Sequence, residues 1–264
     1  METAYRLTAA LGGRMLVQAA LGLLLREQYR DVEWISATWL GNDMVTLAVA
    51  LPLLAASLVS TRHGSARALL LWLGTLAYAL YNYAYYLFGA ALNTFFPLYL
   101  AGLVSAALAL IRAAPGISPS HIADHFTGRT PARLVGGYFV FVGMILAGTW
   151  LGMWAAYVFA GHPTPVEPEA FKLVAALDTV LMAPALVGGG ILLWQRKPVG
   201  YVLSAVAGVQ ASLYLLVLSI NSIIFVARGL ADWPGEAPLW VGLAAVTTAI
   251  TSLLFAHVGG RLEA

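Results

Sequence analysis

Residues 67–89 read RALLLWLGTLAYALYNYAYYLFG, and this stretch decides the fold class. It has no charged residue after its first position and is long enough for a membrane-spanning helix, which needs about 20 predominantly apolar residues. Its second half carries Tyr78, Tyr81, Asn82 and Tyr85, whose i, i+3, i+4, i+7 spacing places them on one helical face. Phenol and amide groups at membrane depth need hydrogen-bonding partners. The stretch therefore predicts a membrane helix that packs against other helices through a polar face.

The composition of the whole chain agrees with this interpretation. Its 264 residues are 61% hydrophobic and 10% charged, with a mean hydropathy of +0.82, whereas about 25% of the residues in a soluble domain are charged. A formal net charge of +2 gives no reason to expect a nucleic-acid partner. The absence of cysteine excludes disulfides, thiolate nucleophiles and cysteine-ligated metals. We therefore expect an all-α integral membrane protein whose main partner is the lipid bilayer.

Hydropathy divides the chain into about eight spans, which form a helical bundle and a single transmembrane domain over residues 1–264. The spans are expected near 5–25, 42–60, 67–89, 92–112, 134–160, 171–194, 199–227 and 238–257. Residues 26–41 are polar and aromatic, and we expect them to form a short interfacial helix between the first two spans. His121 and His125 have the i, i+4 spacing of a zinc pair, but no third ligand is nearby, so no metal site is predicted.

The Lys and Arg residues orient these spans, because cytoplasmic loops carry an excess of positive charge. With the N-terminus in the cytoplasm, nine basic residues fall inside and four fall outside, and Arg14 is left within the first span. We therefore expect both termini to be cytoplasmic.

The two halves of the chain share a pattern that indicates a possible internal repeat. Asp43 precedes Pro52 in the second span, and Asp178 precedes Pro184 in the sixth. A four-plus-four duplication would explain this pattern, with the halves related about an axis along the membrane normal. The aspartate-to-proline spacings differ, and alternating hairpins share this topology by chance, so both interpretations stay open. In each half the following span carries an asparagine, Asn82 or Asn221.

Polar residues inside apolar segments are costly in lipid, so they mark binding sites or helix contacts. Arg14 and Asp178 are the ionisable residues well inside the predicted spans, and we expect them to form a pair. Asp43 lies nearer the outer surface, where water could solvate it. Once the spans are oriented, the polar residues gather in the outer half of the bilayer and predict an outward-facing pocket. The candidate ligand-binding residues are Arg14, Asp43, Tyr78, Tyr81, Asn82, Tyr85, Asp178, Tyr214 and Asn221.

The same residues could instead serve only to hold helices together. Asn82 and Asn221 could bond to each other's backbones, and this interpretation weighs as much as a pocket. Part of the tyrosine cluster falls on another face of its span and could consist of interfacial aromatics, namely Tyr83 and Tyr86. A GxxxG pattern in the fifth span, Gly148 and Gly152, indicates close helix packing.

Three segments resemble an uncharacterised family of bacterial multi-pass integral membrane proteins. They are GND at 41–43 leading to Pro52, YNYAYYLFGAALN at 81–93, and LWQRKPVGY at 193–201. The resemblance covers most of the chain and implies a location in the bacterial plasma (inner) membrane. It implies no activity, cofactor or site residue.

Three functions are compatible with these observations. The leading hypothesis is a small-solute or proton-linked transporter in which Asp178, partnered by Arg14, binds a proton or ion. A membrane enzyme acting on a lipid or hydrophobic substrate in the outer leaflet, with Asp43 or Asp178 as the acid–base group, ranks lower because no nucleophile–base pair is visible. The third is a non-catalytic membrane subunit or sensor. The expected ligand is a small molecule or a lipid, and the sequence identifies no catalytic residue and no cofactor.

Overall fold

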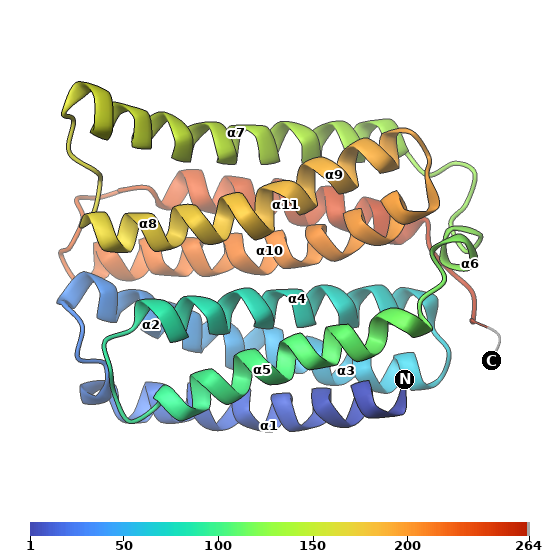
Figure 1. Cartoon of the computed structure of the whole chain (residues 1–264), viewed down its shortest axis with the longest axis horizontal. Helices are drawn as coiled ribbons and strands as arrows, with labels where there is room; N and C mark the ends of the chain where they lie inside the picture. Colours follow the sequence, from blue (N-terminus) through green and yellow to red (C-terminus); the bar gives the residue numbers. More distant parts are fainter. Residues whose placement is uncertain (263–264) are drawn as a thin grey trace.

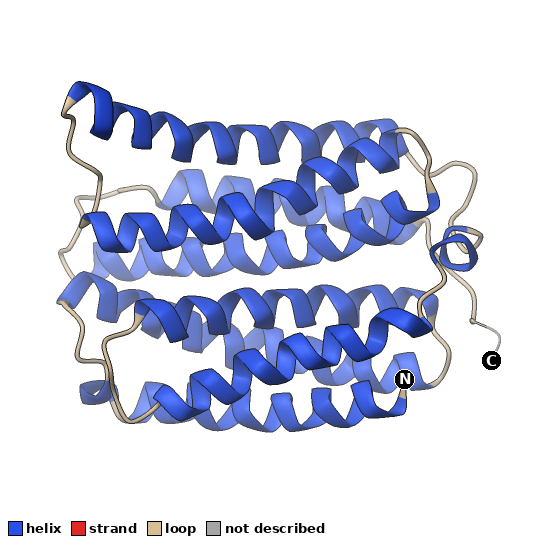
Figure 2. Cartoon of the chain, in the orientation of Figure 1, coloured by secondary structure: helices blue, strands red, loops and turns tan. Residues whose placement is uncertain are grey.

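The computed structural model describes residues 1–262, and within them the chain is a bundle of long helices lying side by side (Figure 1 and Figure 2). Strand structure in the described residues is limited to two isolated bridges, Ser65–Arg261 and Phe126–Val258. The all-α fold class is therefore confirmed. The α-helices are α1 (Glu2–Leu24), α2 (Glu33–Val45), α3 (Leu51–Arg62), α4 (Ala66–Gly89), α5 (Phe96–Ala113), α6 (Pro119–Ala123), α7 (Ala132–Ala160), α8 (Pro168–Leu177), α9 (Ala183–Trp194), α10 (Pro198–Ala227) and α11 (Ala237–Ala256).

Seven helical segments among the described residues are long and apolar enough to cross a membrane, which supports a multi-pass membrane protein in contact with lipid. The one predicted span that is not among them is the third, residues 67–89, which corresponds to α4; this helix has the length, 24 residues, but not the mean hydropathy. The reason is its position: 16 of its residues are buried, so its sequence suits contact with protein rather than with lipid. The seven segments are Glu2–Leu24, Glu33–Arg62, Phe96–Gly116, Ala132–Ala160, Pro168–Trp194, Pro198–Ala227 and Ala237–Ala256.

The two halves of the chain pack against each other through helices α4 and α10, and we call this contact the central seam. In Figure 1 helices α1 to α5 lie below α7 to α11, and α4 faces α10 across the middle. The approach is close because residue 74 is glycine: a Cβ there would lie 2.5 Å from Val209 Cβ and 3.1 Å from the Val206 carbonyl oxygen. Helix α2 also packs against α10, and α8 packs against α4. Side chains from both halves therefore meet along the central seam.

Two of the long helical segments contain a wide turn followed by a proline. A π-helical turn over Thr46–Ala50 joins α2 to α3, and another over Asp178–Met182 joins α8 to α9. Pro52 and Pro184 lie in the first turns of α3 and α9. Because proline cannot donate the i→i−4 hydrogen bond and its ring crowds the preceding turn, a wide turn is a common way to accommodate it.

The prediction of a short interfacial helix over residues 26–41 is wrong. Residues 33–41 do not form a separate interfacial helix but continue through α2 into α3. Only a short 3-10 turn, Arg26–Gln28, precedes them. The polar residues of this segment are tolerated in a long helix because the segment packs against α1 and α10.

Both ends of the described chain lie at the same end of the bundle, and we call it the termini end (Figure 1). Helices α1, α4, α7 and α10 all finish at the other end, which we call the opposite end. One packing prediction is wrong: Gly148 and Gly152 have no neighbouring atom within 4 Å of a Cβ built on them. They do not contact another helix of this chain, because their face of α7 points away from the bundle.

Candidate functional site

A small cavity lies at the central seam towards the opposite end of the bundle, and we call it the seam cavity. Its volume is ≈160 Å³. The predicted polar faces of the third and seventh spans meet here, because both line this cavity. The residues that they contribute are Tyr78, Tyr81, Asn82 and Tyr85 of α4 with Tyr214 and Asn221 of α10. Helix α2 and the start of α11 add Trp34, Thr38, Asn42, Glu236 and Trp240.

Asn221 lines the seam cavity and has a buried amide oxygen that accepts no hydrogen bond. Its Oδ1 is buried and has no partner among the described residues. The side chain fits against α2 because residue 41 is glycine, where a Cβ would collide with Oδ1. The nearby Asn42, by contrast, donates from Nδ2 to the Thr38 carbonyl oxygen at 2.9 Å. A buried acceptor without a donor costs about 1–3 kcal/mol, so a ligand donor that reached Oδ1 would be bound favourably.

Asp178 lies next to the seam cavity and is connected to it through Tyr81. The carboxylate is 1% exposed and lies at the start of the second wide turn. It accepts hydrogen bonds from the Tyr81 hydroxyl at 2.7 Å and from Trp150 Nε1 at 2.9 Å. The Tyr81 ring in turn contacts the Tyr214 ring edge-on, with 4.9 Å between the centroids. A change in the charge of Asp178 would therefore affect two residues that line the cavity, Tyr81 directly and Tyr214 through its contact with Tyr81.

Arg14 is not the partner of Asp178, so the predicted ion pair is wrong. Its Nη1 donates to Ser105 Oγ at 2.8 Å, which joins α1 to α5. The ion pairs within residues 1–262 are two surface pairs, Arg6–Glu2 and Lys172–Glu169. The pair does not form because α1 packs against α5, α2 and α3, whereas the Asp178 turn packs against α7, α8 and α9.

Asp43 forms a second buried carboxylate network, this one inside the first half of the chain. It is 0% exposed, so the prediction that water solvates it is wrong. Tyr29 and Tyr86 donate from their hydroxyls at 2.6 and 2.7 Å, and Gln18 donates from Nε2 at 3.0 Å. Glycine at position 22 makes room, because a Cβ there would collide with the carboxylate. Three donors replace the water that the sequence led us to expect.

The tyrosines around Asp43 are interior groups rather than interfacial anchors. Tyr83 and Tyr86 are 1% and 0% exposed, so their prediction as outer-interface aromatics is wrong. They face the first half of the chain, where Tyr86 stacks on Tyr99 at 5.0 Å. Burial, and after it the charge of Asp43, raise the pKa of Tyr29 in the loop between α1 and α2. Its phenol therefore stays protonated and remains a donor to the carboxylate.

Sequence reasoning did not assign three residues that hold the carboxylates. Gln18 shares a helical face with Arg14, which is a signal for an interior polar group. Tyr29 lies in a loop and Trp150 lies in a span that mostly faces lipid, and neither position has a periodic pattern that would single it out. Only the packing of α7 on α9 brings Trp150 to Asp178.

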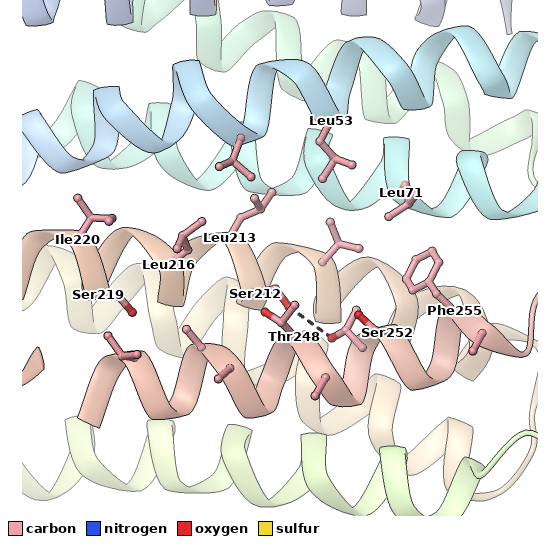
Figure 3. A pocket seen from close by; sticks show the side chains of 18 of the residues that line it. Leu53, Leu71, Ser212, Leu213, Leu216, Ser219, Ile220, Thr248, Ser252 and Phe255 are labelled. Carbon is pink, nitrogen blue, oxygen red and sulfur yellow. Dashed lines mark hydrogen bonds between the residues drawn. The ribbon is translucent and has the colours of Figure 1, made fainter. Parts of the chain in front are cut away.

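A second and much larger cavity is a groove between α3, α4, α10 and α11, with a volume of ≈980 Å³ (Figure 3). It contains none of the nine predicted residues. Its lining is mainly aliphatic, and we call it the lateral groove.

The fold and these two networks define a multi-pass helical membrane protein with a buried polar and aromatic core. Comparison with protein-family models, with curated proteins and with solved structures finds no match. Among the described residues, no group of three or more His, Asp or Glu side chains could hold a metal ion. The interpretation of the site therefore depends on its own geometry.

Proposed function

We propose that this protein is a proton-linked carrier of a small polar solute, that the seam cavity is the solute site and that Asp178 is the proton-binding group. The observation that carries the proposal is the position of Tyr81. This one side chain lines the cavity and also donates to the buried carboxylate. Binding of a solute to Tyr81 and protonation of Asp178 would thus affect each other through this one hydrogen bond.

The dimensions and chemistry of the cavity support a small polar solute. Pockets for drug-sized ligands measure about 300–1,000 Å³, so a cavity of ≈160 Å³ suits a smaller molecule. The acceptor of Asn221 has no donor, and the phenols of α4 offer hydroxyl groups. Aromatic rings complete the wall. A solute with a hydrogen-bond donor, such as an amine or an amide, satisfies the amide oxygen.

The hydrogen bonds of Asp178 support a proton-dependent step. The ionised carboxylate holds Tyr81 and Trp150 as an acceptor for both. A proton on the carboxyl occupies one oxygen and removes the charge that makes these hydrogen bonds strong. The hydrogen bond from Tyr81 is then weaker, and the Tyr81 hydroxyl can bond instead to a solute in the cavity. The wide turn that begins at Asp178 lacks the regular i→i−4 ladder, so it is a natural place for α8 to bend relative to α9.

A four-plus-four repeat about an axis along the membrane normal would fit this carrier. Each half has a buried aspartate, and each has a wide turn followed by proline. Helix α2 packs on α10 as α8 packs on α4. We further propose eight spans in total, with α4 as the eighth, and cytoplasmic termini in a bacterial plasma membrane. The seam cavity then lies in the outer half of the bilayer, and the basic residues support this orientation.

The first test is proton movement in proteoliposomes that contain a pH-sensitive dye. A panel of small amines, amides and amino acids is added outside, and solutes that acidify the lumen are scored. We expect at least one solute to move protons with the wild type and none with Asp178→Asn, which keeps the shape but cannot titrate. Ser212→Ala, in the lateral groove, is the control. Proton-coupled transport by Asp178→Asn at the wild-type rate would show that Asp178 is not the proton-binding group.

A second test separates the solute site from the proton site. Asn221→Ala removes the amide acceptor and leaves Asp178 in place. We expect it to raise the solute concentration needed for half-maximal transport, while coupled proton movement persists at high solute concentration. An unchanged concentration dependence would place the solute elsewhere.

The role of a membrane subunit is the alternative that one observation favours. Gly148 and Gly152 lie on an open face of α7, and small residues spaced in this way let helices from different chains approach closely. A fixed partner that co-purifies with the wild type but not with Gly148→Leu would favour this alternative. The enzyme alternative, with Asp43 or Asp178 as the acid–base group, gains no comparable support. Asp43 is enclosed by protein donors, and among the described residues no nucleophile lies in hydrogen-bond contact with Asp178, whose donors are a tyrosine and a tryptophan.

A further inference from the structure

The lateral groove is separate from the seam cavity and opens to the outside of the bundle. Leu213 and Leu216 of α10, with Leu71 of α4, form its floor (Figure 3). Leu53 of α3 and Phe255 of α11 lie on opposite walls. In a bilayer such a groove faces acyl chains. It is therefore a site for a membrane component rather than for a solute from water.

The groove is elongated along the helix axes. On α11 its lining runs from Val241 to Ala256, which is about 22 Å at a rise of about 1.5 Å per residue. The hydrocarbon core of a bilayer is about 30 Å thick. The groove thus extends over most of one bilayer thickness, which suits an extended chain better than a compact ring system.

The groove is wide enough for such a chain, and few groups in its lining need a hydrogen-bond partner from a ligand. Small side chains on the α11 wall keep the groove wide, namely Ala245 and Ala249. Two of the hydroxyls on α10 are already satisfied: Ser212 donates to the Gly208 carbonyl at 2.8 Å and Ser219 donates to the Leu215 carbonyl at 2.7 Å. Thr248 and Ser252 of α11 add two hydroxyls to a lining that is otherwise mainly aliphatic, so the occupant of the middle of the groove is mostly apolar (Figure 3).

Positive charge lies at the end of the groove nearest the termini. Arg67 lines the groove and uses Nη2 to bind the Val258 carbonyl oxygen at 2.8 Å. A guanidinium has five N–H donors, so others remain for a ligand. The backbone of Arg261, a second basic residue, forms a bridge to Ser65, two residues before Arg67. Neither guanidinium pairs with a carboxylate within residues 1–262, and guanidinium groups bind phosphate through paired hydrogen bonds.

We propose that the lateral groove holds one anionic phospholipid, with an acyl chain along α11 and the phosphate at Arg67. A single charged end on a long apolar groove matches an amphiphile with one anionic head. A partner helix would fill the apolar part but would leave the arginine without an anion. This site is independent of the proposed carrier mechanism, since it shares no residue with the seam cavity.

The test is native mass spectrometry of protein released from nanodiscs that contain equal amounts of phosphatidylglycerol and phosphatidylcholine. We expect the wild type to retain one phosphatidylglycerol. Arg67→Gln should lower the preference for the anionic lipid about fivefold, because one arginine near a membrane surface contributes about that factor. Arg112→Gln, which changes an exposed arginine of α5 outside the groove, should leave the preference unchanged. Equal retention of both lipids by the wild type would overturn the proposal.

A second pair of variants tests the acyl-chain part of the site. Ala249→Trp fills the groove, whereas Val246→Trp places the same ring on the same helix outside the groove. We expect the retained lipid to disappear in the first variant and to persist in the second. Ala245→Phe serves the same purpose if the tryptophan variant does not fold. Retention by both filled variants would contradict the proposal, and so would a thermal stabilisation by inorganic phosphate as large as that by the lipid.

Discussion

The replacement of Gly74 by alanine tests the central seam most directly. A methyl group there would lie 2.5 Å from Val209 Cβ and 2.8 Å from Val209 Cγ1, with the Val206 carbonyl oxygen at 3.1 Å. Val209 is β-branched and buried, so it cannot turn away freely. Overpacking of this kind costs about 1–3 kcal/mol. Alanine in a helix gains about 0.5–1 kcal/mol over glycine, so the expected net loss is up to about 2.5 kcal/mol.

Gly148→Ala is the matched control, because the same residue change occurs in a helix with no atom within 4 Å of the new methyl. The propensity gain is common to both variants, so their difference isolates the packing cost of about 1–3 kcal/mol. In thermal unfolding of the purified protein in one detergent, this corresponds to a gap of about 2–12 °C in Tm. A Gly74→Ala variant as stable as Gly148→Ala would refute the close contact between α4 and α10.

Two further predictions concern the Asp43 network. Tyr86→Phe removes a donor from a buried carboxylate and should lower the free energy of unfolding by about 1.5–3 kcal/mol. Tyr83→Phe removes a buried hydroxyl that has no partner among the described residues, so it should be neutral or stabilising. Equal losses of unfolding free energy for the two variants in chemical denaturation would count against the hydrogen bond from Tyr86. Tyr29 contributes through a raised pKa, so its contribution to stability is complete below the pKa of the unfolded phenol, about 10, and falls at higher pH by up to about 1.4 kcal/mol per pH unit. The difference in unfolding free energy between the wild type and Tyr29→Phe should therefore shrink as the pH is raised above about 10. A free-energy difference that stays constant with pH would contradict the raised pKa of Tyr29.

Much of the fold follows from properties that are local in the sequence. Seven spans are visible as long apolar stretches, because each must expose an apolar surface to lipid. An even number of spans predicts that the two ends of the chain lie at one end of the bundle, and the described ends do lie together (Figure 1). The polar faces of α4 and α10 are visible because a helical period of 3.6 residues places Tyr78, Tyr81 and Asn82 on one side. Each of these signals depends on neighbours within one or two helical turns.

The partners of the charged groups could not be predicted in the same way. The sequence suggests a pair between Arg14 and Asp178 because they are the isolated charges in two spans, yet α1 packs on α2, α3 and α5, whereas the turn of Asp178 packs on α7, α8 and α9. The position of Asp43 near a span end suggests contact with water, yet α1, α4 and the loop at Tyr29 close over it. A helical period assigns a face to each residue but does not say which helix meets that face.

The sequence by itself thus determined the membrane class, the number of long helices to within one, and the two polar faces that line the seam cavity. The tertiary structure alone decided that Tyr81 and Trp150 hold Asp178, that Asp43 is sealed, and that a lateral groove ends at Arg67. The physical reason lies in the range of the interactions. Hydropathy and helical period act between residues close in the chain, whereas hydrogen bonds and cavities depend on contacts between helices far apart in it.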